Sequence, residues 1–314
     1  MGVTSEDIFG DAAGAQLATP GSYGVAPSPH RLPERLTLGP VRLQIADLQR
    51  SIAWYQQVLG LQVVEQSEHH AALGAQESAT PLVHLHHRAG ATPSPRRGRH
   101  GLYHFAILLP DRPALGRFIQ HLGEINVRAG AADHLVSEAF YLQDPDNLGI
   151  EIYADRPREQ WRRVQRELMM ASDPVDVADL VRAAAGSAWT GMPAGTTMGH
   201  LHLHVGDLDD ASRFYHNGLG FDRMVWGYPG ALFLGAGGYH HHLGTNTWAG
   251  DSATAPAANE AQLLEWTMEF PNETSVAAAI ASLRQHGFDS DELAAGTDYR
   301  VRDPWGTAVR LIRG

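Results

Sequence analysis

The chain has 314 residues, of which 43% are hydrophobic and 19% are charged, a balance that allows about two packed domains and excludes a disordered chain. Its 35 acidic residues outnumber 24 Lys and Arg, and the net charge of −11 argues against a nucleic-acid partner. No apolar run approaches the roughly 20 residues that span a bilayer, and the N-terminus does not resemble a secretory signal. We therefore expect no membrane contact and a cytoplasmic location.

The histidine and cysteine counts restrict the chemistry further. The chain contains 18 His and no Cys. Without thiols it has no disulfides, no thiolate metal sites and no cysteine nucleophile. A transition metal, if one is bound, must be held by imidazole and carboxylate groups.

In chain order, residues 1–36 are rich in Gly, Ala, Ser and Pro, and this composition predicts a flexible N-terminal arm. An internal repeat follows, because residues 45–64 resemble residues 205–224. Four matched pairs share one spacing of 160 positions; Asp47, Tyr55, Leu59 and Gly60 match Asp207, Tyr215, Leu219 and Gly220. The two halves therefore look like copies, with domains expected over 37–157 and 198–314 and a helical linker over 158–197.

Each half divides again into two units. A unit begins with an alternating apolar strand and continues with an amphipathic helix of about three turns. An aspartate precedes the helix as N-cap, and a glycine follows it as C-cap. Three short strands complete a βαβββ pattern, which we expect four times, over 38–93, 100–155, 198–250 and 259–314. The expected fold class is thus α+β.

Four tandem units of this kind resemble the vicinal oxygen chelate superfamily, which contains glyoxalase I and the type I extradiol ring-cleaving dioxygenases. Four phrases carry a closer resemblance to the two-domain catechol 2,3-dioxygenase group: HGLYHFAILLPDR, DHLVSEAFYLQDPDNLGIEIYADRP, GHLHLHVGDL and GGYHHHLGTNTWAG. The resemblance runs from about residue 38 to the C-terminus. It implies two glyoxalase/extradiol-dioxygenase-like domains.

Two imidazoles and a carboxylate stand at matching positions of the repeat. His104 and His200 lie in the first strands of the second and third units, and Glu151 lies in the last strand of the second unit. Such a set suits non-haem Fe(II), with Mn(II) as a second ion, and the resemblance assigns metal ligands to these positions. His202 and His204 share the face of His200, which we prefer because the ligand in the resembling family stands at the start of this strand.

Units one and four lack this ligand set. Pro40 occupies the matching position of the first unit, while the fourth unit has Glu265 in its first strand and Arg310 in its last. A complete triad therefore needs units two and three to face each other. The simplest arrangement would instead pair one with two and three with four.

Further residues are expected to move protons. The run from Tyr239 to His242 is expected on the last strand of the third unit, and the resemblance implies a catalytic His there. Because side chains alternate along a strand, we favour His242 and then His240. The resemblance also implies roles for Tyr141, ten residues before Glu151, and for His134.

The leading hypothesis is Fe(II)-dependent extradiol cleavage of catechol or a substituted catechol by O₂, giving a 2-hydroxymuconic semialdehyde-type product. One alternative is a glyoxalase-like metal-dependent isomerase or lyase, which resembles a four-ligand site; the fourth-position candidate here is His242. The other is a metal-free module that binds a small aromatic molecule. The sequence leaves a homo-oligomer open, since exposed sheet edges in such folds often pair.

Overall fold

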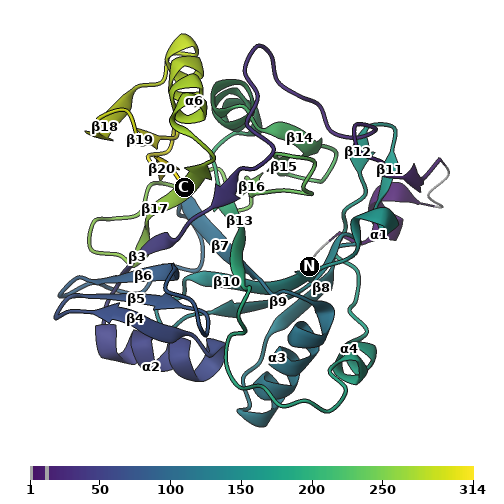
Figure 1. Cartoon of the computed structure of the whole chain (residues 1–314), viewed down its shortest axis with the longest axis vertical. Coiled ribbons are helices and arrows are strands. Elements are labelled where there is room, and N and C mark those ends of the chain that lie inside the picture. The colour runs from purple at the N-terminus through teal and green to yellow at the C-terminus, as the bar shows by residue number, and fades with distance from the viewer. Residues whose placement is uncertain (1–2, 11–13) are drawn as a thin grey trace.

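The computed structural model describes residues 3–10 and 14–314 and has a mixed α+β fold built mainly of strands (Figure 1). Four βαβββ units are present, as the repeat predicts. The first two comprise β3 (Val41–Ile45), α2 (Leu48–Leu59), β4 (Gln62–Gln66), β5 (His70–Gly74), β6 (Pro81–His87), and then β7 (Gly101–Leu108), α3 (Arg112–Glu124), β8 (Gly130–Asp133), β9 (Ser137–Gln143), β10 (Gly149–Asp155).

The third and fourth units repeat this order, with one irregular helix. In the third, a short α-helix continues as a π-helix, η2. The elements are β13 (Thr197–His204), α5 (Leu208–Ala211), η2 (Ser212–Leu219), β14 (Asp222–Val225), β15 (Ala231–Gly235), β16 (Leu243–Asn246), and then β17 (Gln262–Phe270), α6 (Glu273–Gln285), β18 (Ser290–Ala294), β19 (Asp298–Arg302), β20 (Ala308–Arg313).

The helix boundaries follow from local chemistry. The Asp47 side chain accepts the Arg50 backbone N–H at 2.9 Å, and Asp207 caps α5 in the same way. Gly60 ends α2 in the left-handed conformation at φ 70°, where a side chain would be strained. The predicted caps are confirmed.

Strand pairing does not follow the two expected domains. β7 of the second unit pairs antiparallel with β13 of the third, and β3 of the first pairs with β17 of the fourth. The eight strands of units two and three thus form one continuous ladder, and those of units one and four form another. The short strand β2 (Thr37–Leu38) joins them, because Leu38 pairs with both β13 and β17.

Within each half the units are linked by a buried hydroxyl–carboxylate bond. The Tyr55 hydroxyl of α2 donates to Asp144 in the second unit at 3.2 Å, and Tyr215 donates to Asp303 at 2.8 Å. Each aspartate also accepts two backbone N–H groups of its own turn. Asp144-Pro145 and Asp303-Pro304 therefore belong to structural turns.

The expected helical linker over 158–197 is wrong in its first part. After the 3₁₀ turn η1 (Arg158–Gln160), strands β11 (Arg162–Val164) and β12 (Glu167–Leu168) form a hairpin, and only α4 (Val177–Ala183) is a regular helix. β11 pairs with β1 (Gln16–Leu17), which supplies the partner that a hairpin edge needs. No helix in the described ranges is long and apolar enough to cross a membrane.

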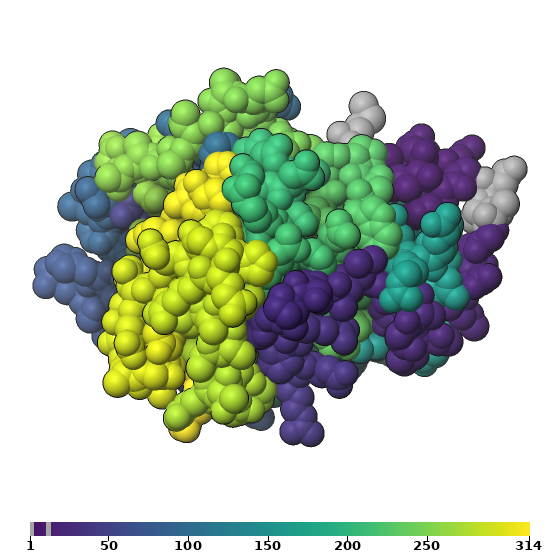
Figure 2. Space-filling view, turned by 90° about the horizontal axis from the view of Figure 1, so that it is seen from above, coloured from purple at the N-terminus to yellow at the C-terminus, as the bar shows by residue number. Residues whose placement is uncertain are grey.

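The described part of the N-terminal segment is packed rather than a free arm. Helix α1 (Ser5–Phe9) is anchored where the Ser5 backbone N–H donates to Asp173 at 2.7 Å. Leu32 and Leu36 are buried in the main core. Figure 2 shows the segment in purple, spread over the surface beside the teal hairpin and the green third unit. Its apolar residues are too few to form a repeat pattern, so composition alone pointed to flexibility.

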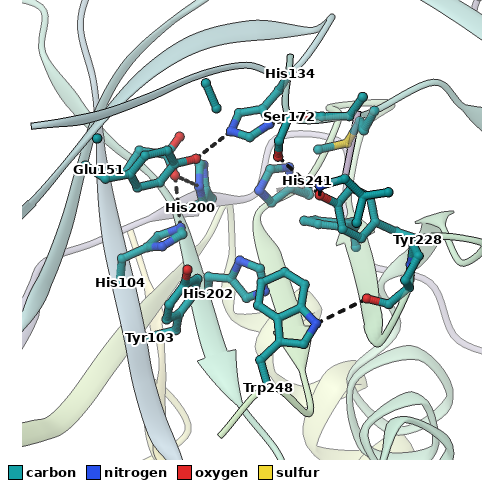
Figure 3. A pocket seen from close by; sticks show the side chains of 18 of the residues that line it. Tyr103, His104, His134, Glu151, Ser172, His200, His202, Tyr228, His241 and Trp248 are labelled. Carbon is teal, nitrogen blue, oxygen red and sulfur yellow. Dashed lines mark hydrogen bonds and ion pairs between the residues drawn. The ribbon is translucent and has the colours of Figure 1, made fainter. Parts of the chain in front are cut away.

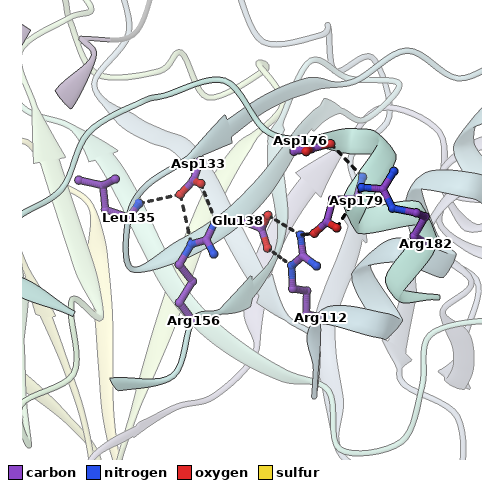
Figure 4. A network of polar contacts seen from close by, with 8 residues as sticks. All are labelled: Arg112, Asp133, Leu135, Glu138, Arg156, Asp176, Asp179 and Arg182. Atoms are coloured by element: carbon purple, nitrogen blue, oxygen red, sulfur yellow. Dashed lines mark hydrogen bonds and ion pairs between the residues drawn. The ribbon is translucent and has the colours of Figure 1, made fainter. Parts of the chain in front are cut away.

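Ion pairs tie α3 and α4 to the sheet of the second unit (Figure 4). Arg112 contacts Glu138 in β9 at 2.5 Å and Asp179 in α4 at 2.9 Å. Arg156, just after β10, contacts Asp133 at 2.5 Å. These contacts hold the strand that carries Glu151.

Candidate metal centre

Three adjacent strands bring His104, Glu151 and His200 together. β7 lies between β10 and β13, and carries His104. Glu151 and His200 both lie opposite Ala106 of β7, from its two sides. Because side chains alternate along a strand, Ala106 and His104 share a face, so the three side chains meet on one surface of the sheet.

The three side chains converge closely in the structure (Figure 3). Their ligand atoms lie within 4.8 Å of one another, and all three residues are buried. His104 Nε2 is 2.9 Å from Glu151 Oε2, and His200 Nε2 is 3.2 Å from the same oxygen. The first contact is close but does not have hydrogen-bond geometry, so His104 Nε2 is without a hydrogen-bond partner in the described chain, as are Glu151 Oε1 and His200 Nδ1. Buried polar atoms are normally paired, so this arrangement fits a site whose lone pairs are reserved for a cation.

The electrostatics favour the form that ligates a metal. Burial lowers the pKa of His104 and of His200, which keeps both rings neutral near pH 7. Burial alone raises the pKa of Glu151, but the neighbouring His200 and His104 outweigh it and hold that pKa well below its usual range. Metal ligands must be deprotonated, and all three groups meet that condition. The residues present thus fit a divalent cation.

The triad opens into a cavity of about 630 Å³. Aromatic side chains form much of its wall: Tyr103, Tyr141, Tyr228, Phe233 and Trp248. Trp248 is fixed by its indole N–H, which donates to the Pro229 carbonyl at 3.1 Å. The cavity suits a flat apolar molecule with a polar edge, because aromatic side chains can contact its faces and the polar cluster can contact its edge.

His134 and Tyr141 both line this cavity and contact each other. His134 Nε2 and the Tyr141 hydroxyl are 2.5 Å apart, and His134 Nδ1 is 2.6 Å from the Ala171 carbonyl. A carbonyl only accepts, so Nδ1 carries the proton and, in a neutral ring, Nε2 accepts from Tyr141. Burial raises the pKa of Tyr141 well above its ordinary value, with Glu151 adding to the effect. The hydroxyl therefore remains protonated and oriented.

Comparisons with known proteins agree with this architecture. The family model described as the Glyoxalase/Bleomycin resistance protein/Dioxygenase superfamily matches residues 37–152 and 197–311. The chain belongs to this superfamily. It is 41% identical over 270 residues to a Bacillus subtilis (strain 168) protein named catechol-2,3-dioxygenase, covering 85% of this chain and 93% of that one.

Solved structures share the superfamily fold at low sequence identity. A Bacillus subtilis subsp. subtilis str. 168 structure described as a candidate dioxygenase gives a TM-score of 0.60 at 13% identity, covering 88% of this chain and 85% of its own. Glyoxalase I from Zea mays gives 0.51 at 17% identity, covering 88% and 92%. Both likenesses concern the fold alone.

The prediction that His242 or His240 faces the cavity is wrong. His241 lines the cavity, and its ring centroid lies 4.1 Å from that of His200. His242 accepts the Ala236 backbone N–H at 3.2 Å and faces a separate pocket. The alternation argument fails because residues 237–242 form a turn, with β16 beginning only at Leu243.

A glyoxalase-like fourth ligand is also missing at the repeat position. Glu151 pairs with the second residue after His104, and Gly244 pairs with the second residue after His200. Gly244 is thus the counterpart of Glu151 in the third unit, and it offers no ligand atom. The arrangement favours a set of three protein ligands.

Sequence reasoning missed most of the cavity wall. Tyr103 and Trp248 lie within two of the four resembling phrases but were expected to have no role, and Val3 reaches the cavity from the segment expected to be flexible. His202, which sequence analysis ranked behind His200, also lines the cavity, and its Nε2 is buried without a partner in the described chain. For His241, the available signal was the Gly237-Gly238 pair before the His run, which indicates a turn rather than a strand because both residues have positive φ.

Proposed function

We propose that this protein is an Fe(II)-dependent extradiol dioxygenase that cleaves catechol or a substituted catechol beside the diol. Both atoms of O₂ enter the product, which is of the 2-hydroxymuconic semialdehyde type. The observation that carries the proposal is the buried His104–Glu151–His200 cluster at the wall of an aromatic cavity. The 41% identical relative named catechol-2,3-dioxygenase supports the same reaction class.

The three residues would hold the ion from one side. Two imidazoles and one carboxylate form a facial triad, and Mn(II) is a second ion that suits this set. When bound, divalent iron would supply open coordination positions at which a catechol and O₂ can react.

The remaining side chains of the cavity have separate roles. His241, beside His200, is placed to accept a proton from a catechol hydroxyl. Tyr141, whose proton is engaged by His134, presents its oxygen lone pairs to the cavity and can accept a substrate hydrogen bond. Trp248, Tyr228 and Phe233 bind the aromatic ring and exclude water.

The alternatives fit the site less well. An isomerase of the glyoxalase type would use a fourth ligand, where Gly244 stands. A metal-free binding module would leave Glu151 Oε1 and His200 Nδ1 buried without partners in the described chain.

The test uses protein purified without air, loaded with Fe(II) and mixed with catechol in air. We expect a yellow ring-cleavage product and stoichiometric O₂ uptake. Glu151→Gln, loaded in the same way, serves as the control and should give neither. An iron-containing wild-type protein that leaves a panel of catechols uncleaved would contradict the proposal.

A further inference from the structure

A chain of two hydrogen bonds leads away from the cavity through His241. His241 Nδ1 and His240 Nδ1 are 2.7 Å apart, and His240 Nε2 is 2.8 Å from Asp155 Oδ1. His240 is completely buried, whereas the Asp155 side chain is 28% exposed. Asp155 lies at the end of β10 and lines a separate groove beside Arg112 and Arg156. The chain therefore joins the cavity wall to a second surface.

The hydrogen-bond partners fix where the protons of this chain lie. A carboxylate only accepts, so His240 Nε2 carries a proton and donates it to Asp155. A neutral His240 then has a bare Nδ1, which accepts from the Nδ1–H of His241. A neutral His241 in turn has a bare Nε2. No hydrogen bond to that Nε2 is present in the described part of the chain.

Asp155 also accepts a second hydrogen bond. The Tyr239 hydroxyl donates to the same Oδ1 at 3.2 Å, and the Tyr153 hydroxyl lies 2.6 Å from that of Tyr239. Because Tyr239 donates to Asp155, Tyr153 must donate to Tyr239. This second bond leads away from the two histidines, so only His240 connects the carboxylate to His241.

We propose that Asp155 is a positioning residue that acts through His240 to fix the ring and tautomer of His241. The unprotonated Nε2 of His241 is thereby presented to the cavity, where it accepts the hydrogen bond of a substrate hydroxyl. This inference rests on the proposed function for its substrate, but the tautomer itself is a property of the chain alone.

Asp155→Asn is the decisive variant. An amide can donate to His240 Nε2, which reverses the chain and places a proton on the Nε2 of His241. We expect kcat for catechol to fall about 100-fold, with KM changed by less than about threefold. Asp155→Glu restores a carboxylate and should recover most of the lost kcat.

Tyr239→Phe is the matched control. It removes the other hydrogen bond to the same carboxylate oxygen and keeps the His240–Asp155 bond. We expect its kcat to stay within about threefold of wild type. A loss in Tyr239→Phe equal to that in Asp155→Asn would show that Asp155 matters only for packing, which would overturn the inference.

A second measurement does not depend on turnover. Long-range ¹H–¹⁵N spectra of the full-length protein loaded with diamagnetic Zn(II) report which nitrogen of each imidazole carries a proton. We expect a bare Nε2 at His241 in wild type and a protonated Nε2 in Asp155→Asn. A protonated Nε2 in wild type would overturn the inference, as would an unchanged tautomer in Asp155→Asn.

The two proposals can fail separately. A protein that shows the expected tautomers but never cleaves a catechol would contradict the proposed function and leave the positioning role intact. If Asp155→Asn does not fold, the wild-type spectrum still decides the tautomer, and His240→Gln breaks the chain at its middle member.

Discussion

Two buried glutamates of the second unit, Glu138 and Glu151, have partners of different charge. Glu138 contacts Arg112 at 2.5 Å and Arg156 at 3.4 Å, so its charge is offset by guanidinium groups. Glu151 instead meets two imidazoles whose lowered pKa values leave them neutral. Glu138 therefore stabilises the fold through two cations, whereas Glu151 has neutral partners and keeps an oxygen without a partner in the described chain, which a bound cation could use.

This contrast predicts unequal effects of removing the two charges. With a chelator present, Glu151→Leu should lower the free energy of unfolding by only about 1 kcal/mol, because the partners that this carboxylate loses are neutral imidazoles. Glu138→Leu, the matched control, should lower it by roughly 3 kcal/mol, since two guanidinium groups lose their partner. Urea unfolding with chelator and with Mn(II) measures both.

The metal-dependent part of that experiment is equally specific. Mn(II) should raise the unfolding free energy of wild type and of Glu138→Leu, but not that of Glu151→Leu. Stabilisation of Glu151→Leu by the metal would show that the ligand set has been assigned incorrectly.

How much of the site was predictable depended on the local backbone. His104, Glu151 and His200 lie in regular strands at matching repeat positions, which is why the repeat could single them out, and the strand register places them on one face. His241 lies in a turn after two glycines with positive φ, where alternation has no meaning. Tyr103 and Trp248 reach the cavity through tertiary packing, which has no sequence period.

At the scale of elements, the contact between β10 and β7 sets the distance from Glu151 to His104. A Cβ added to Gly149 at the start of β10 would lie 2.0 Å from the Tyr103 carbonyl oxygen of β7. Backbone cannot move aside as a flexible side chain can, so the absence of a side chain here permits the two strands to approach.

Gly149→Ala should therefore push the two strands apart. We expect the free energy of unfolding to fall by about 2–3 kcal/mol and Mn(II) affinity to fall with it. Gly123→Ala, in α3 with no atom within 4 Å of the new Cβ, should be neutral or stabilising by up to about 1 kcal/mol. Equal behaviour of the two variants in unfolding and metal titration would contradict this account.

The hairpin formed by β5 and β6 carries a second group of histidines. Burial, the neighbouring His70 and the Arg42 charge lower the pKa of His84 to about 4; burial, Arg42 and His70 do the same for His86. Unfolded histidine has a pKa of about 6.5. Between these values the unfolded chain binds more protons, so acidification should progressively destabilise the fold from about pH 6.5 down to 4.

His84→Gln should weaken this pH dependence. The loss of unfolding free energy between pH 7 and pH 5 should shrink on the order of 1 kcal/mol, a figure discounted for partial exposure. His69→Gln, at an exposed position in the bend just before β5, should leave the dependence as in wild type. An identical pH dependence in wild type and His84→Gln would refute the explanation.

At the scale of the whole molecule, the repeat was visible in the sequence but the pairing of its units was not. Matching residues define what each unit contains. Which sheet edges meet depends on surfaces brought together in three dimensions, such as the β7–β13 contact. The triad indicated this pairing only because its ligands lie in different halves.

The two hydroxyl–carboxylate links between units should contribute alike. Burial raises the pKa of Asp144 to about 7, and Tyr55 is one of the donors that offset this effect. We expect Tyr55→Phe and Tyr215→Phe each to lower the free energy of unfolding by about 1.5–3 kcal/mol. The double variant should show the sum, because the two pairs share no partner.

Tyr299 provides a comparison, because its ring is partly buried but its hydroxyl bond lies at the surface. Its hydroxyl donates to Glu292 at 3.3 Å at the surface, and Tyr299→Phe should change the free energy of unfolding by less than about 0.5 kcal/mol. Equilibrium unfolding of the four variants tests all these values. A clear departure from additivity would show that the two links are coupled.

The exchange of partners between the halves explains why the described part of a chain with two similar halves holds one such triad rather than two. In the fourth unit, Glu265 stands where the third unit has His200, and Arg310 stands where the second unit has Glu151. Arg300 contacts Glu265 at 2.5 Å. On that face a salt bridge has replaced the ligands. In each half, one unit supplies residues to the metal site, and the other unit is free to change as long as it still folds. Neither half can now be inherited alone, because each holds only part of the triad.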